Sequence, residues 1–191
     1  LMMCHNISKL MQSTIDLEKV LYVILNCVTA GYGLGFNRAM LLLVYKNSKD
    51  KLNGVIAVGP KNKEEAYRIW NELSGINLSS IKMDNIIEIY NGVFSKKDEH
   101  LDYIAKKINI SLSEDNIFSE IIKKGTSVVV TDARNNNKVP REFFNIWGAN
   151  VFAIAPLVSK YEVLGAIVAD NIYNEKPIID EHIELLNGFA N

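Results

Sequence analysis

Two apolar runs near the C-terminal end of the chain constrain its fold more than any other feature. Residues 151–158 and 163–169 are almost continuously apolar, and only the short segment 159–162 separates them. Runs of this length are typical of β-strands, and so short a connection joins antiparallel neighbours. Because neither run alternates with polar residues, each strand needs cover on both of its faces. The chain is therefore predicted to form an antiparallel sheet between layers of helices.

Three further segments have the composition of strands. Residues 38–45 form a nearly unbroken apolar run, and residues 55–58 follow a polar turn region and end at Gly59 and Pro60. We expect these two segments to form a second hairpin. Residues 127–131 indicate one more strand. The result is an α+β fold with five or six strands.

Helical spacing of apolar residues marks the remaining elements. The strongest pattern covers residues 17–28, and glycines at 31, 33 and 35 end it. A first amphipathic helix is expected within residues 1–15, a short one over 141–147, and a last one over 178–191. Helical stripes also occur at these positions: 66–73, 83–90, 101–108 and 117–122. Most of them lie in a block of helices at about residues 61–110.

Composition excludes several classes of protein. The chain has 191 residues, 48% of them hydrophobic, and a formal net charge of -1. This composition is too apolar for a disordered chain, and the balanced charge argues against binding to nucleic acid. The longest apolar runs are far shorter than the roughly 18 residues that a membrane helix needs. No membrane span and no signal peptide are therefore expected, and we expect a cytoplasmic protein.

Cysteine and histidine placement argues against a disulfide framework or a metal site. Cys4 and Cys27 both lie on apolar helical stripes, which favours buried reduced thiols. The three histidines, His5, His100 and His182, share no ligand spacing with each other or with the cysteines. No metal is expected.

At this point three segments resemble a known family. Residues 33–44, GLGFNRAMLLLV, resemble the first strand of GAF domains, in particular those of bacterial signalling proteins such as sensor histidine kinases. Residues 128–134, VVVTDAR, resemble a later strand and loop of these domains. The pair formed by 153–158 and 164–171 resembles their final hairpin.

The resemblance implies a GAF/PAS-like fold with a six-stranded antiparallel sheet and helices on both faces. One face would carry a pocket, and the terminal helices would pack on the other. Residues 1–191 would then be a single domain, with a linker or dimer helix at 1–15 and the start of a signalling helix at 178–191. Leu1 and Asn191 fit a piece excised from a longer protein. The helical block at about 61–110 would be an insertion that caps the pocket or adds to a dimer surface.

The best-known ligands of GAF domains find little support here. No complete cyclic-nucleotide signature can be traced, and the cysteines that a bilin or methionine sulfoxide reduction requires are missing from the pocket region. Haem would need an axial histidine, but His100 lies in the insertion and His182 in the last helix. The cofactor is therefore unknown, with no metal, haem or bilin expected.

A candidate ligand site remains in the loop and helix at 132–147. Guanidinium groups beside aromatic rings can bind a small anionic or aromatic molecule by hydrogen bonds and stacking. The alternative is that the charged residues order the loop and the aromatic rings fill the core. The candidate ligand-binding residues are Arg134, Arg141, Phe143, Phe144, Trp147 and Asp170.

Three functions compete at this stage. The first is a noncatalytic sensory domain that binds a small molecule and controls an attached output domain such as a histidine kinase. It would act as a homodimer through its terminal helices. The second is a ligand-free dimerisation scaffold of the same fold. The third is an enzyme, although the sequence contains no recognisable catalytic motif. The glycines at 31, 33 and 35 are not a dinucleotide-binding fingerprint, because they follow a helix and precede a strand, the reverse of the required order.

Overall fold

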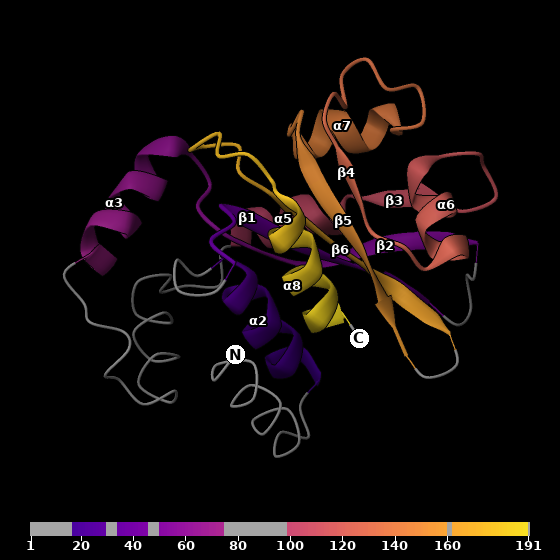
Figure 1. The fold of residues 1–191 in the computed structure, drawn as a ribbon, viewed down its shortest axis with the longest axis horizontal. Helices are drawn as coiled ribbons and strands as arrows, with labels where there is room; N and C mark the ends of the chain where they lie inside the picture. Colours follow the sequence, from indigo (N-terminus) through magenta and orange to yellow (C-terminus); the bar gives the residue numbers. More distant parts are fainter. Residues whose placement is uncertain (1–16, 30–33, 46–49, 75–98, 160–161, 191) are drawn as a thin grey trace.

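The computed structural model describes residues 17–29, 34–45, 50–74, 99–159 and 162–190. Within them, six strands form one antiparallel sheet in the order β3-β2-β1-β6-β5-β4 (Figure 1). The strands are β1 (Arg38–Val44), β2 (Lys51–Val58), β3 (Asn109–Ser111), β4 (Val128–Val130), β5 (Phe152–Val158) and β6 (Val163–Asp170). The helices are α2 (Leu17–Thr29), α3 (Lys63–Ser74), α5 (Glu99–Lys106), α6 (Ile117–Lys124), α7 (Arg141–Trp147) and α8 (Asp180–Ala190).

Both predicted hairpins are confirmed. β1 pairs with β2, and β5 pairs with β6, in each case antiparallel. The central contact of the sheet is the pairing of β1 with β6, which aligns Arg38 with Asp170 at one end and Leu43 with Gly165 at the other. The N-terminal and C-terminal halves of the chain are therefore hydrogen-bonded to each other in the middle of the sheet, where β1 pairs with β6.

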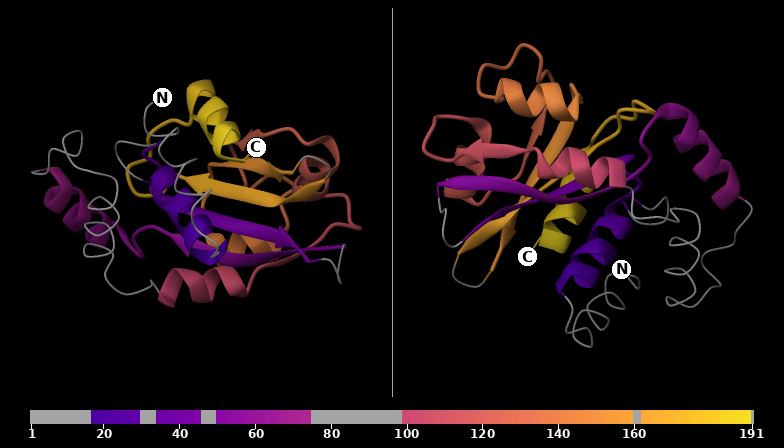
Figure 2. Two further views of the ribbon diagram at one scale, coloured as in Figure 1. Left: turned by 90° about the horizontal axis from the view of Figure 1, so that it is seen from below. Right: turned by 180° about the vertical axis from the view of Figure 1, so that it is seen from behind.

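Helices cover both faces of the sheet, as the unalternating strands predicted. Figure 2 shows α5, α6 and α7 on one side and α2 and α8 on the other. The first side holds the α7-side core, a cluster of twenty buried residues that includes Met40, Phe118, Phe143 and Trp147. The second holds the α8-side core, in which the α2 stripe of Leu21, Ile24, Leu25 and Val28 is buried.

The block predicted as an insertion at about 61–110 divides into several parts. α3 stands beside the sheet in Figure 1, whereas α5 packs along β2 and buries Leu101 and Ala105 in the α7-side core. The C-terminal end of this block overlaps β3, a strand that the sequence pattern did not predict. Its helix α5 is thus part of the core. The stripe at 83–90 and the N-terminal helix at 1–15 lie outside the described residues.

Candidate functional site

The loop between β4 and α7 folds onto itself through a network of hydrogen bonds. The Asp132 carboxylate accepts a hydrogen bond from the Asn135 amide at 2.8 Å, and its carbonyl accepts one from the Asn136 N–H at 3.0 Å. The Asn150 side chain accepts a hydrogen bond from the Arg134 N–H at 2.8 Å. The hydrogen bond from Asn135 holds the pKa of Asp132 below its usual value. The backbone of this loop is therefore tied down by its own polar side chains.

The cations of this loop have different partners. Lys138 forms an ion pair with Glu120 of α6, which raises the pKa of Lys138 and lowers that of Glu120. The Arg141 guanidinium donates a hydrogen bond to the Arg134 carbonyl. The Arg134 side chain is exposed, and its positive charge helps to lower the pKa of the Asp132 carboxyl. Arg134 and Arg141 are thus neighbours, and the Arg134 guanidinium faces solvent.

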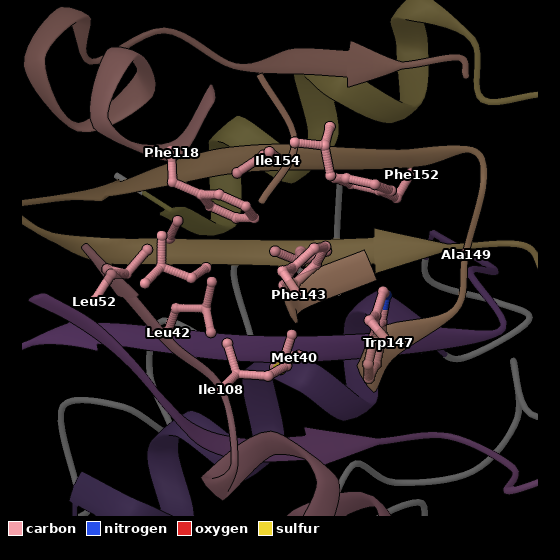
Figure 3. Close-up of a cluster of buried hydrophobic side chains, with 14 of the residues drawn as sticks. Met40, Leu42, Leu52, Ile108, Phe118, Phe143, Trp147, Ala149, Phe152 and Ile154 are labelled. Carbon is pink, nitrogen blue, oxygen red and sulfur yellow. The ribbon is translucent and has the colours of Figure 1, made fainter. Parts of the chain in front are cut away.

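The three aromatic candidates on α7 divide between surface and core. Phe144 is half-buried, whereas Phe143 and Trp147 are only 1% and 2% exposed. The Phe143 ring lies 4.8 Å from that of Phe118 and 5.4 Å from that of Phe152, measured between centroids (Figure 3). Phe143 and Trp147 therefore contact other core side chains, and Phe144 is the aromatic candidate nearest to solvent.

Asp170, the last candidate, lies in the interior and pairs with a residue that the sequence analysis did not single out. Its carboxylate is fully buried and accepts hydrogen bonds from the Arg38 guanidinium, with an Nη2–Oδ2 distance of 2.8 Å. The Arg38 Nε lies 3.2 Å from the same oxygen. Burial raises the pKa of Asp170, and the Arg38 guanidinium opposes that rise.

Arg38 also contacts α7 and the loop that follows β6. Its Nη2 donates a hydrogen bond to the Trp147 carbonyl at 3.0 Å, and its guanidinium lies 4.0 Å from the centre of the Trp147 ring. The Tyr173 ring centre is 5.7 Å away.

The six predicted site residues therefore divide between exposed and buried positions. Arg134 and Arg141 are exposed, Phe144 is half-buried against the α7-side core, and the inner residues Phe143, Trp147 and Asp170 are buried. The inner residues are held by packing and by Arg38. A detectable signal for Arg38 existed in the sequence, because it opens an apolar strand while Asp170 closes another, and antiparallel pairing can bring such ends together.

A separate open groove of about 250 Å³ runs beside β2. Tyr45, Asp102 and Lys106 supply its polar lining, and Leu21, Val55 and Ile56 supply apolar side chains. None of the six predicted site residues lines this groove. It is distinct from the β4–α7 loop, here named the cationic loop because it carries Arg134 and Lys138.

The described part of the chain has no metal-binding cluster and no membrane-spanning helix. No cluster of three or more His, Cys, Asp or Glu residues with metal-binding geometry occurs there. Cys27 is buried on α2 and forms no disulfide with a described residue. Among the described helices, none combines the length and apolar character required to traverse a bilayer.

Comparisons with known proteins identify the fold. No protein-family model and no curated protein matches the chain. Three similar solved structures are a methyl-accepting chemotaxis protein (residues 122–287), the GAF domain of an Acinetobacter phosphoenolpyruvate-protein phosphotransferase, and free methionine-R-sulfoxide reductase from Neisseria meningitidis with its substrate. Their TM-scores are 0.60, 0.58 and 0.58, at sequence identities of 16%, 13% and 15%. The alignments cover 97%, 98% and 98% of this chain and 90%, 85% and 81% of those chains.

At these identities the likeness shows the fold alone. The six-stranded antiparallel sheet with helices on both faces is the GAF fold, as the sequence motifs predicted. The same fold occurs in signalling proteins and in an enzyme.

Proposed function

We propose that this chain is a noncatalytic, cytoplasmic regulatory domain that binds a small anionic molecule at the β4–α7 loop. In this proposal it controls an attached output domain, such as a histidine kinase, through α8. The observation that carries the proposal is the two-sided construction of the sheet. The cationic loop and α7 lie on one side, and the terminal helices α2 and α8 lie on the other. Solved structures of the same fold come from a chemotaxis protein and a phosphotransferase.

The proposed ligand contacts are the exposed Arg134 guanidinium, Arg141 and the half-buried Phe144. Guanidinium groups bind carboxylates and phosphates through two parallel hydrogen bonds, and an aromatic ring beside them adds a stacking surface. The inner residues Phe143, Trp147 and Asp170 would support this surface from below. The ordered loop supplies preorganisation, which lowers the entropic cost of binding.

A thermal-shift screen of anionic metabolites tests this site. We expect at least one carboxylate, inorganic phosphate or nucleotide to raise the melting temperature of the wild-type chain. The same compound should lose its effect on Arg134→Ala, but not on Lys123→Ala, an exposed lysine of α6. An identical shift in wild type and Arg134→Ala would refute the role of Arg134, and no shift with any anion would refute the proposed ligand class.

One observation favours the ligand-free scaffold as a second candidate. Nine of the twelve largest fully buried side chains among the described residues belong to the α7-side core, where a pocket on the sheet would lie. Figure 3 shows Phe118, Phe143 and Trp147 spread over this face of the sheet. A ligand-free role would leave the thermal-shift screen negative while the dimer described next is retained.

Dimerisation through the terminal helices is part of both candidates. α8 exposes Leu185 at 41%, and the apolar stripe at residues 1–15 supplies further apolar surface in the sequence. Multi-angle light scattering of the full chain and of a chain without residues 1–15 tests this. We expect a dimer for the first and a monomer for the second. A monomeric full chain would contradict the proposal.

The proposal of a noncatalytic domain has its sharpest competitor in the reductase that shares the fold. Catalysis by thiols needs accessible, activated cysteines. Of the two cysteines, Cys4 lies outside the described residues, and Cys27 is buried on α2, which supports the noncatalytic proposal for that thiol. Turnover of free methionine sulfoxide by the chain with a thiol reductant would overturn it.

A further inference from the structure

The buried Arg38 guanidinium contacts two segments that are far apart in the sequence, the end of α7 and residues 170–173. It pairs with Asp170 at the end of β6, donates to the Trp147 carbonyl at the end of α7, and lies near the Tyr173 ring. Arg38 is 6% exposed and Asp170 is 0% exposed, so water does not compete for these contacts. An arginine is suited to this position because its planar fork can pair, donate and stack at once.

The loop that follows Asp170 is held by the neighbour of Arg38. The Asn37 Oδ1 accepts hydrogen bonds from the N–H groups of Tyr173 and Asn174, at 2.8 and 2.9 Å. The Asn37 N–H lies 3.2 Å from the Asn171 Oδ1, and the Tyr173 hydroxyl donates to the Pro60 carbonyl at 3.0 Å. The start of β1 therefore sets the position of the loop at 171–179.

That loop leads directly into α8. The helix begins at Asp180, and the Ile179 N–H donates to the His182 Nδ1 at 3.2 Å, which caps the first turn. α8 packs on β5 across the sheet from α7. The loop at 171–179, whose position Asn37 and Arg38 help to fix, therefore continues directly into α8.

α7 is the other partner of Arg38, and it carries part of the proposed ligand surface. Arg141 is exposed, Phe144 is half-buried against the α7-side core, and Trp147 faces the guanidinium. The helix has seven residues, about 10 Å in length, so its two ends move together as one short body. Displacement at Arg141 would therefore reach the Trp147 carbonyl.

We propose that Arg38 is a positioning residue that couples α7 to the loop 171–179 and hence to α8. The inference rests on the proposed regulatory function, which it deepens by naming the route of transmission. A shift of α7 pulls on the Arg38 guanidinium through the Trp147 carbonyl and ring. Arg38 passes that shift to Asp170, after which the chain enters the loop. A buried pair that only stabilises the fold would not relay a local change in α7.

Hydrogen exchange in the full chain without ligand tests the coupling. Asn145 is an exposed residue of α7, and Asn145→Gly loosens that helix without touching Arg38. We expect the exchange rates of the Tyr173 and Asn174 amides to rise measurably but by less than about 2-fold, because asparagine and glycine differ little in helix propensity and a coupled site cannot respond by more than the perturbation supplies. In the background Arg38→Met with Asp170→Asn, the same Asn145→Gly change should leave these rates unaltered. The paired substitution removes both charges, so no unpaired charge is buried.

Two controls keep the result decisive. Lys123 of α6 is exposed, as Asn145 of α7 is. Lys123→Gly therefore loosens α6 in a comparable position and should not raise the exchange rate of the Tyr173 amide. Arg38→Lys replaces the paired variant if that variant does not fold, because an ammonium cannot pair, donate and stack together. The proposal is overturned if Asn145→Gly leaves the loop unchanged in the wild-type background. It is also overturned if the effect is equal with and without Arg38, or if Lys123→Gly reproduces it. Because no ligand is present, failure here leaves the anion screen unaffected.

Discussion

Gly54 marks the closest approach of α5 to the sheet. A Cβ atom at this position would lie 2.0 Å from the Ala105 carbonyl oxygen, which is backbone and cannot rotate away. The Gly54 N–H also donates to the Ile108 carbonyl at 3.0 Å. Helix and strand are therefore held together at a distance that only glycine permits.

We predict that Gly54→Ala destabilises the fold by about 1–3 kcal/mol, the usual cost of inserting a methyl group into a packed contact. Gly188→Ala is the matched control, because a Cβ there meets nothing within 4 Å. Gly188 lies within α8, where alanine is favoured over glycine by about 0.5–1 kcal/mol. Urea unfolding followed by circular dichroism measures both. Equal destabilisation by the two substitutions would contradict this account of Gly54.

The buried pair of Arg38 and Asp170 yields a second prediction at this scale. Arg38→Met should cost about 3–5 kcal/mol, since it leaves a carboxylate buried without its counter-charge. Adding Asp170→Asn should recover a large part of the loss, because an uncharged amide replaces the orphaned carboxylate. The free energy of unfolding of wild type, both single variants and the double variant completes the cycle. Strict additivity of the two single changes would show that the residues act independently.

Single residues also show where sequence reasoning stops. The apolar pattern correctly placed Phe143 and Trp147 on one helix, but helical spacing does not say whether a ring faces a ligand or a neighbouring strand. Asp170 was predicted as a ligand contact, whereas it pairs with Arg38 in the interior. The sequence shows that both residues lie at the ends of apolar strands, but their pairing depends on the register of β1 against β6, which the sequence does not specify.

Helix α6 shows how one residue can define the start of an element. The Asn116 Oδ1 accepts hydrogen bonds from the N–H groups of Phe118 and Ser119, both at 3.0 Å. The Ser119 hydroxyl accepts one from the Asn116 N–H, completing a capping box. The Asn116 Nδ2 also donates to the Ser111 carbonyl at 2.7 Å, which ties α6 to β3.

Asn116→Ala should therefore destabilise the chain by about 1–2 kcal/mol, at the upper end of measured cap losses. Asn116→Asp keeps the acceptor that caps the helix but loses the donor to Ser111, so it should fall between alanine and wild type. Thermal unfolding by calorimetry resolves the order. A loss for Asn116→Asp equal to that for Asn116→Ala would assign the effect to the contact with β3 and not to the cap.

The ion pair between α6 and the β4–α7 loop makes the stability of this region dependent on pH. The hydrogen bond from Lys138 lowers the pKa of Glu120 from 4.5, so the folded chain binds this proton less readily than the unfolded chain. The stabilisation is fully present above about pH 4.5 and is lost as the pH falls through the lowered pKa of the folded state. Acid should therefore weaken the link between loop and helix.

We predict that the difference in unfolding free energy between wild type and Glu120→Gln shrinks as the pH falls from about 6 to 3. Glu142→Gln is the control, because Glu142 is exposed and forms no ion pair with a described residue. Urea unfolding at each pH measures both differences. A constant difference for Glu120→Gln across this range would contradict the assigned ion pair.

Elements with a strong periodic pattern were predicted well. The short helix at 141–147 has the same bounds in the structure, and the helical stripe at 117–122 lies within α6, which Gly125 caps. β3 was missed because it has three residues and only Ile110 is buried. β2 begins at Lys51 and not at residue 55, because α5 covers a segment whose polar composition suggested a turn. Short or polar strands depend on neighbours that local sequence does not name.

At the scale of the whole molecule, the sheet separates two different cores. The α7-side core packs large aromatic rings beneath the cationic loop, and the α8-side core buries one stripe of each terminal helix. The fold was predictable because hairpin signals and unbroken apolar strands leave few arrangements, and the family motifs selected one of them. The candidate site was predictable only in part, since the sequence located the loop and could not separate its outer from its inner residues.

The central claim is that an anion bound at the β4–α7 loop is sensed by the C-terminal helix on the opposite face. NMR titration of the full chain with the anion that gives the largest thermal shift tests it most directly. We predict that the Arg134 side-chain signal and the backbone amides of α8 shift together, with one dissociation constant. The account is contradicted if the Arg134 signal moves while the α8 amides stay in place, or if neither responds.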